Sequence, residues 1–206
     1  MKLWKIVVPL LALALALCAC APAGETSKPP AQEPSQGADP AVRSWNDVPW
    51  DEHMELEYAQ SFSVDYYGDF KRVTIDAETY LVAPEGVDGA PFLDMPEDVT
   101  VLRQPIRNIY LQATAAMDCF RKLDAMDAVT LVGTDAAGWY LPEVKEAMEA
   151  GRMVYAGKYS APDYELLQAS GCGMALESTM IYHNPEVKEQ LERLGIPVLV
   201  ERSSYE

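Results

Sequence analysis

Short apolar segments alternate with helical patterns from about residue 99 to residue 200, and this alternation restricts the possible folds more than any other feature. The expected strands are residues 99–102, 129–132, 153–156, 174–176 and 197–200. Strands joined through helices form right-handed crossovers, which build a parallel sheet with helices on both faces. We therefore predict the α/β fold class, as a three-layer, Rossmann-like lobe.

Four helices are expected between these strands. Apolar residues recur at helical spacing within residues 109–123, at Ile109, Ala113, Ala116, Phe120 and Leu123. Residues 142–150 and 162–170 each begin with a proline and are followed by a glycine, which is typical of helix starts and stops. The last helix is expected to begin at Pro185, with Asn184 as its N-cap, and to stop at Gly195.

An antiparallel β meander is expected to precede the α/β part. Residues 58–66, 70–75 and 79–82 are rich in aromatic and β-branched residues and read as strands. Gly68 and Asp69 form a turn signal between the first two. A loop through Pro96 then leads to the alternating region.

The N-terminus has the features of a secretory signal. Lys2 and Lys5 precede an apolar run over residues 6–17. Residues 17–20, LCAC, resemble the bacterial lipoprotein cleavage box, in which a small residue precedes the cysteine that becomes lipidated. Cys20 fits that pattern, whereas Cys18 follows the large Leu17. We expect a signal peptide over residues 1–19 and a lipid on Cys20 that holds the protein at the outer face of the cell membrane; an ordinary cleaved signal is the alternative.

Residues 20–45 are rich in proline, alanine and serine and contain almost no large apolar side chain until their end. Such a segment cannot build a core, so we expect a tether. The folded part is then expected over residues 46–206.

The chain is strongly acidic. It has 32 acidic and 16 basic residues and a formal charge of −16, and removal of Lys2 and Lys5 with the signal would change this to −18. A nucleic-acid-binding protein needs a basic face, so this class is excluded. The charge favours a soluble monomer.

Basic and aromatic residues follow several predicted strands at the carboxyl edge of the sheet, where ligands of such folds bind. Arg103, Lys158 and Arg202 predict an anionic ligand there; the alternative is that these cations pair with Glu177 and Glu201. Flat aromatic surface comes from Trp139, Tyr140, Tyr159 and Tyr182. Each of these aromatic side chains has an alternative role as a cover on the core.

Other common sites are not indicated. The sequence lacks G-x-S-x-G, G-x-G-x-x-G after a strand, and the phosphate-binding G-x-x-x-x-G-K-[ST] motif. Its two histidines, His53 and His183, are too few for a multi-histidine metal site, and we expect His53 to be solvated. Cys119 is expected in the core and Cys172 in a tight turn, with a disulfide between them left open.

Five stretches together carry a family resemblance: VLRQP at 101–105, NIYL at 108–111, AGKYSAPDYE at 156–165, ESTMIYH at 177–183 and LGIPVLVE at 194–201. They resemble the first lobe of the periplasmic-binding-protein family that serves ATP-driven (ABC) importers of ferric siderophores, haem and cobalamin. The lipoprotein start and tether resemble the Gram-positive form of these receptors. The implied fold is the N-lobe of a type III periplasmic-binding protein.

The resemblance implies capture of a metal chelate and its delivery to an ABC permease and its ATPase, without catalysis and without a cofactor. The ligand-binding residues expected are Arg103, Gln104, Trp139, Tyr140, Lys158, Tyr159, Thr179, Met180 and Tyr182. An acidic residue of this lobe docks on the permease in the family, which corresponds to Glu165, with Asp163 as its possible substitute. An anionic siderophore is preferred over cobalamin because of the cations, and haem, through Tyr182 and His183, comes third.

Family members have two lobes, whereas this sequence ends at Glu206, where the helix that joins the lobes is expected. The expectation is that the chain is truncated before the second lobe and binds its ligand weakly by itself. Two other classes remain open: an exported hydrolase that uses Ser178 or Thr179 with His183, and a surface adhesion or scaffold lipoprotein.

Overall fold

The computed structural model describes residues 43–88 and 91–202. The predicted signal peptide, Cys20 and the tether up to residue 42 lie outside the described residues. Residues 43–45, predicted as the end of the tether, belong to the folded part, since the Trp45 N–H donates to the Leu93 carbonyl at 2.7 Å. No helix within the described ranges is long and apolar enough to span a membrane.

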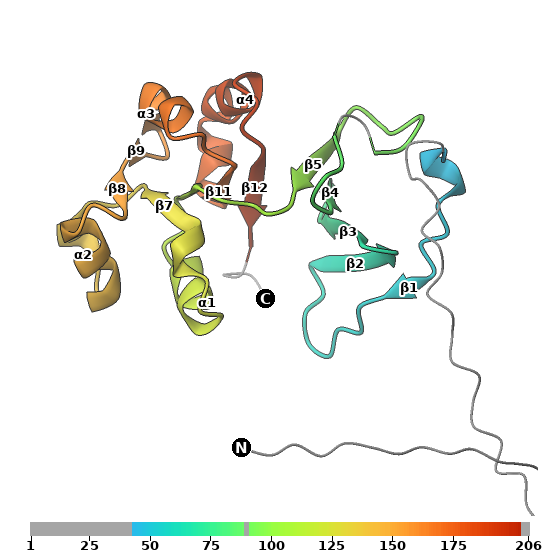
Figure 1. Ribbon diagram of the computed structural model, residues 1–206, viewed down its shortest axis with the longest axis horizontal. Helices are drawn as coiled ribbons and strands as arrows, with labels where there is room; N and C mark the ends of the chain where they lie inside the picture. Colours follow the sequence, from blue (N-terminus) through green and yellow to red (C-terminus); the bar gives the residue numbers. More distant parts are fainter. Residues whose placement is uncertain (1–42, 89–90, 203–206) are drawn as a thin grey trace, which may run out of the picture. The chain divides into compact units, whose positions relative to one another are not determined.

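The first sheet is the predicted meander, extended at both edges (Figure 1). Its strands, in spatial order, are β1 (Glu52–His53), β2 (Phe62–Tyr67), β3 (Phe70–Ile75), β4 (Glu78–Ala83) and β5 (Val99–Arg103). The first four pair antiparallel, and β5 pairs parallel to β4. The prediction for residues 70–75 is confirmed, but residues 58–61 are not in the strand, and Tyr58 is 83% exposed.

The second sheet has five strands, all parallel. Its spatial order is β12 (Val198–Glu201), β11 (Met174–Ser178), β6 (Ile109–Leu111), β7 (Val129–Val132) and β8 (Val154–Tyr155). The chain adds β7 and β8 on one side of β6 and then β11 and β12 on the other, so the strand order reverses between β6 and β11. This confirms a mixed α/β fold with a parallel sheet.

Two predictions about this sheet are wrong. Residues 99–102 do form a strand, but β5 belongs to the meander sheet. Residues 109–111, predicted as the start of a helix, form the central strand β6. Ile109, Tyr110 and Leu111 are all buried because both faces of β6 are covered, and a fully buried strand lacks the alternation that reveals strands in a sequence.

Helices cover both faces of the parallel sheet. They are α1 (Ala116–Lys122), α2 (Pro142–Glu149), α3 (Tyr164–Ala169) and α4 (Pro185–Arg193). Met117 of α1 and Val144 of α2 pack in one core with Leu111, whereas Leu167 of α3 and Leu191 of α4 pack in the other, with β6 and β11 between. The described chain also contains shorter elements: η2 (Trp45–Asp47), which precedes the meander, η3 (Met126–Ala128), η4 (Ala136–Gly138), η5 (Thr179–His183), β9 (Gly157–Lys158) and β10 (Ala161–Pro162).

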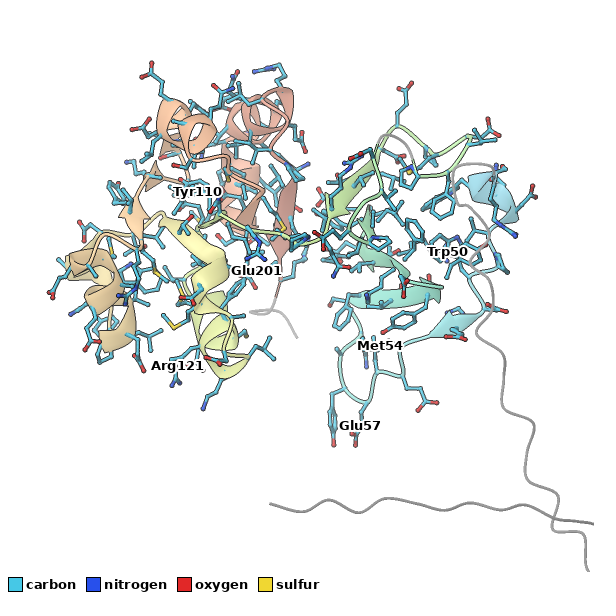
Figure 2. All side chains as sticks on the ribbon, in the orientation of Figure 1. Trp50, Met54, Glu57, Tyr110, Arg121 and Glu201 are labelled. Atoms are coloured by element: carbon cyan, nitrogen blue, oxygen red, sulfur yellow. The ribbon has the colours of Figure 1, made fainter. Side chains whose placement is uncertain are left out.

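Tyr80 of the meander connects the two sheets. Its ring lies in the same core cluster as Leu111, and its hydroxyl accepts the Val200 N–H at 3.4 Å while donating to Glu78. An ion pair between Arg202 and Asp76 adds to this contact. A separate aromatic cluster around Phe92 fills the other face of the meander, and Trp50, which Figure 2 labels, belongs to it.

A test of the core compares two leucines of the α/β unit. Leu111 is fully buried, whereas Leu123, which the sequence placed on an apolar helix face, is 76% exposed. We expect Leu111→Ala to lower the free energy of unfolding by about 2–5 kcal/mol, because it leaves a cavity. Leu123→Ala serves as the control and should change it by less than about 0.5 kcal/mol. Urea denaturation measures both, and similar values for the two variants would contradict this packing.

Candidate functional site

The carboxyl edge of the parallel sheet is the candidate site. In open α/β sheets, ligands bind beyond the carboxyl ends of the strands, at the point where the strand order reverses. Here this point lies between Leu111 of β6 and Ser178 of β11. The segments that follow the strands begin at residues 112, 133, 156 and 179.

Two side chains of the central strand region converge on one backbone carbonyl at this edge. The Tyr110 hydroxyl donates to the Gly157 carbonyl at 2.7 Å, and the Gln112 Nε2 donates to the same oxygen at 2.9 Å. The Gln112 amide also contacts the Tyr110 hydroxyl. These bonds fix the start of the β9–β10 hairpin, which carries Lys158 and Tyr159.

Two glycines make room for this arrangement. A Cβ on Gly133 would lie 1.9 Å from Gln112 Oε1, so the bare backbone after β7 leaves space for the amide. Gly157 has φ +85°, and a Cβ there would lie 2.4 Å from the Ala161 carbonyl oxygen. Glycine is therefore required at position 157, whereas a side chain at position 133 would displace the Gln112 amide.

Glu177 is a buried carboxyl group next to this cluster. It is 0% exposed, and neither of its side-chain oxygens has a hydrogen-bond partner among the described residues. Tyr110 pairs with Ala175 across β6 and β11. Side chains two residues apart lie on the same face of a sheet, so Gln112 and Glu177 lie beside each other on the face that carries Tyr110. Burial raises the pKa of the Glu177 carboxyl from 4.5 to about 8, and burial together with the nearby Glu177 raises the pKa of Tyr110. Glu177 is therefore protonated at neutral pH.

This burial makes the stability of the fold depend on pH. Between pH 4.5 and about 8 the unfolded chain ionises Glu177 while the folded chain keeps its proton, so the free energy of unfolding falls as the pH rises. The slope from this group is about 1.4 kcal/mol per pH unit. We expect Glu177→Gln to remove this contribution and to be more stable than wild type by a margin that increases from about pH 5 to about pH 8.

Urea denaturation at a series of pH values measures this margin. Glu146→Gln, at an exposed position of α2, is the matched control and should follow the wild-type curve. A constant difference between wild type and Glu177→Gln across this range would show that Glu177 is ionised in the folded protein.

Several exposed aromatic and thioether side chains lie in the segments that follow the strands. Tyr140 is 98% exposed, Met180 45% and Tyr182 47%, although large apolar side chains are normally buried. Lys158 is exposed, and Tyr159 and Thr179 are partly buried. The predicted residues Tyr140, Lys158, Tyr159, Thr179, Met180 and Tyr182 therefore all lie in segments at this edge.

Other predicted ligand residues lie elsewhere. Trp139 is only 4% exposed and donates its indole N–H to the Thr134 carbonyl at 3.0 Å, so it is part of the core and does not offer a ligand surface. Arg103 ends β5 in the other sheet, and Gln104 follows it. The prediction that these two residues join Lys158 at one sheet edge is therefore wrong, because β5 is not part of the parallel sheet.

The alternative that the cations pair with Glu177 is wrong, whereas pairing with Glu201 stays a prediction. Glu177 cannot neutralise the cations of the edge, because it is enclosed in the core without a partner. Arg202 instead pairs with Asp76, which lies in the β3–β4 turn.

Ser178, one of the two nucleophiles proposed for hydrolysis, acts as a helix cap. Ser178 Oγ accepts the Met180 N–H at 3.4 Å as the N-cap of η5, and among the described residues no hydrogen bond joins it to the exposed His183. His53 is exposed to solvent as expected, with its side chain 62% accessible, and its Nδ1 also lies 2.5 Å from Asp65 Oδ1. Arg72 binds the other oxygen of Asp65.

Both described cysteines are free, so the disulfide that the sequence left open is absent from this part of the chain. Cys119 is exposed on α1 and not in the core. No group of three His, Cys, Asp or Glu residues within 43–88 and 91–202 is placed to hold a metal ion.

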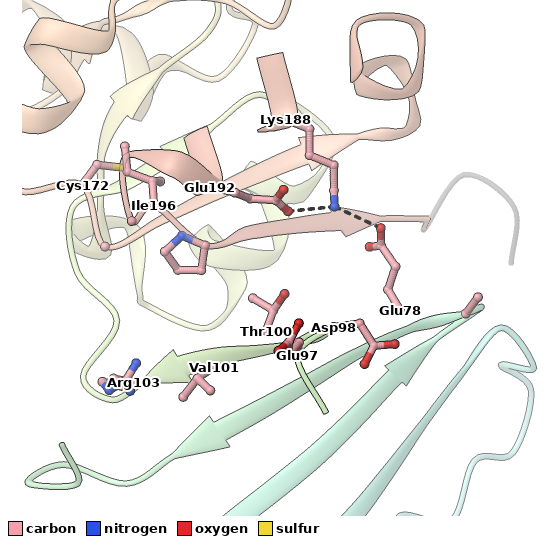
Figure 3. Close-up of a pocket in the computed structure, with 14 residues that line it drawn as sticks. Glu78, Glu97, Asp98, Thr100, Val101, Arg103, Cys172, Lys188, Glu192 and Ile196 are labelled. Atoms are coloured by element: carbon pink, nitrogen blue, oxygen red, sulfur yellow. Dashed lines mark hydrogen bonds and ion pairs between the residues drawn. The ribbon is translucent and has the colours of Figure 1, made fainter. Parts of the chain in front are cut away.

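A second concave surface lies between β5 and α4 (Figure 3). This cleft has a volume of about 830 Å³, and Cys172, Gly173 and Pro197, which precede β11 and β12, form part of its wall. The cleft also includes Ala77, Glu78 and Lys188, so it extends along α4 from the amino ends of these strands. Its charged lining residues are Glu78, Glu97, Asp98, Arg103, Lys188 and Glu192.

Sequence reasoning missed Tyr110 and Gln112, because it placed residues 109–123 in one helix. It noted Glu177 only as a partner for cations. An acidic residue that directly follows the apolar run 174–176 was the available signal for a buried carboxyl group.

No protein-family model matches the chain, and no curated protein matches it significantly. The geometry of the two surfaces and the sequence resemblance are therefore the basis for assigning a function.

Proposed function

We propose that the α/β unit is the first lobe of a lipid-anchored substrate-binding protein that captures a ferric siderophore or a related metal chelate for an ABC importer. The observation that carries this proposal is the exposure of Tyr140, Met180 and Tyr182, which all lie in segments that follow strands of the parallel sheet. Large flat apolar surfaces beside a few polar groups are typical of ligand sites. The sequence resemblance and the lipoprotein start support the same class.

In this proposal the exposed side chains pack against the apolar faces of the chelate. The Lys158 ammonium contacts anionic oxygens of the ligand. Tyr159 and Thr179 add hydrogen-bonding groups, and the bonds from Tyr110 and Gln112 to Gly157 hold the hairpin that carries Lys158. The protein performs no covalent chemistry.

Amide NMR titration of the isolated chain with a ferric hydroxamate or a ferric catecholate siderophore tests the proposed site. A single lobe contacts one side of a ligand, so we expect weak binding, which NMR detects. The non-paramagnetic gallium complexes give the same contacts without broadening. We expect shifts confined to residues 133–140, 157–162 and 178–183, and reduced by Tyr140→Ala and Tyr182→Ala.

Tyr58→Ala is the matched control, since Tyr58 is similarly exposed but lies in the meander region. It should leave the shifts unchanged. Shifts at other surfaces, or none at about 1 mM ligand, would refute the proposed site.

Glu165 is the proposed contact to the permease. It is exposed in the first turn of α3, and the described residues offer it no ion pair. Asp163 is already engaged, because its Oδ1 accepts the Leu166 N–H at 3.0 Å as the helix N-cap. An unpaired carboxylate beside a capped helix is free to bind an arginine of another protein.

We expect Glu165→Ala to reduce importer-dependent uptake while ligand binding and stability stay the same. Asp163→Ala should instead lower the free energy of unfolding by about 1 kcal/mol, through loss of the cap. Uptake in cells and urea denaturation of the purified variants separate the two effects. Full uptake by the Glu165→Ala variant would remove the docking role.

A further inference from the structure

The strand β5 is an edge strand that faces the cleft shown in Figure 3. Its one neighbour is β4, to which it pairs in parallel. The Gln104 N–H donates to the Ala83 carbonyl of β4. In a parallel ladder, alternate residues of a strand bond to the same neighbour, so the backbone groups of Thr100 and Leu102 also point to β4. The N–H and C=O of Val101 therefore point to the open edge, and Val101 lines the cleft.

An open strand edge binds extended peptides through backbone hydrogen bonds. The volume of about 830 Å³ accommodates a short extended segment between β5 and α4. The opposite wall comes from Lys188 and Glu192 of α4 and from Ile196, so a segment that pairs with β5 would also contact this helix.

The charge of the cleft indicates the kind of segment that fits. Four carboxylates line it against two basic side chains. The Lys188 ammonium is shared between Glu192 at 2.8 Å and Glu78 at 3.4 Å. Glu97 and Asp98 are exposed just before β5, and within the described part of the chain neither forms an ion pair. The entrance to the strand edge is therefore negative.

We propose that this cleft docks an extended basic segment of another protein, which adds to β5 as a further strand. Backbone groups of Val101 would pair with the segment, and Glu97 and Asp98 would bind its lysine or arginine side chains. This proposal does not depend on the chelate site, because it uses the open edge of β5 and the carboxylates of the cleft.

The segment over residues 20–42 is not a suitable occupant. Residues 20–42 contain five prolines and three acidic residues against one lysine, so they would be repelled and cannot donate a regular ladder. A second copy of the chain carries the same net charge of −16 and would also be repelled.

Fluorescence anisotropy with labelled peptides tests the proposal on the purified chain. The probe is the peptide KVTVTVK, and its acidic counterpart is EVTVTVE. A third peptide has the basic sequence with alternate backbone N-methyl groups, so that it cannot form a ladder. We expect KVTVTVK to bind at least about tenfold more tightly than either of the others.

Two variants locate the binding. Val101→Pro removes the outward N–H, and Glu97→Lys with Asp98→Lys reverses the charge at the entrance while leaving the backbone intact. Each should weaken binding of KVTVTVK by about tenfold or more. Glu146→Lys with Glu149→Lys, on the exposed face of α2, makes the same change in net charge and should weaken it far less.

Several results would overturn the proposal. The first is that the acidic or the N-methylated peptide binds as tightly as KVTVTVK. The second is that the charge reversal on α2 weakens binding as much as the one before β5. The third is that KVTVTVK does not bind at about 1 mM. Sedimentation analysis showing a dimer that Val101→Pro dissociates would assign the edge to a second copy of the chain instead. If Val101→Pro unfolds the protein, the charge-reversed pair still decides the outcome.

Discussion

The α/β unit depends on the burial of the short strand β6 on both of its faces. Ile109 and Leu111 pack in the core formed with α1 and α2, and Tyr110 packs in the core formed with α3 and α4. None of the three is more than 4% exposed. Burying each large side chain stabilises the fold by about 1.5–3 kcal/mol. These three residues belong to both cores of the α/β unit, and Tyr80 of the meander packs in the same core as Ile109 and Leu111.

The same burial controls the polar groups where β6 ends. Polar groups that are removed from water need hydrogen-bond partners within the protein, and the Tyr110 hydroxyl and the Gln112 amide both donate to the Gly157 carbonyl. Glu177, on the neighbouring strand, has no such partner and remains protonated. The hairpin that carries Lys158 is thus held by buried hydrogen bonds, while the exposed side chains of the edge stay available to a ligand.

The two surfaces of the described chain differ in chemistry in a way that suits separate roles. The carboxyl edge combines aromatic and thioether side chains with one exposed lysine, which favours a small ligand with apolar faces. The cleft beside β5 is lined by carboxylates and an open strand edge, which favours a polypeptide. The two surfaces come near each other at Tyr182, because burial and the nearby cleft residue Glu78 raise the pKa of this tyrosine.

The sequence by itself determined the class of the fold and most of its elements. Helix signals at Pro142 and Pro185 and the strands at 70–75 and 129–132 are local, because they depend on proline geometry and on side-chain periodicity. It also identified Tyr140, Lys158, Met180 and Tyr182 as edge residues. Only the tertiary structure decided that β5 pairs with the meander, that β6 is the central strand and that Glu177 is buried, because strand partners and burial depend on contacts between residues far apart in the chain.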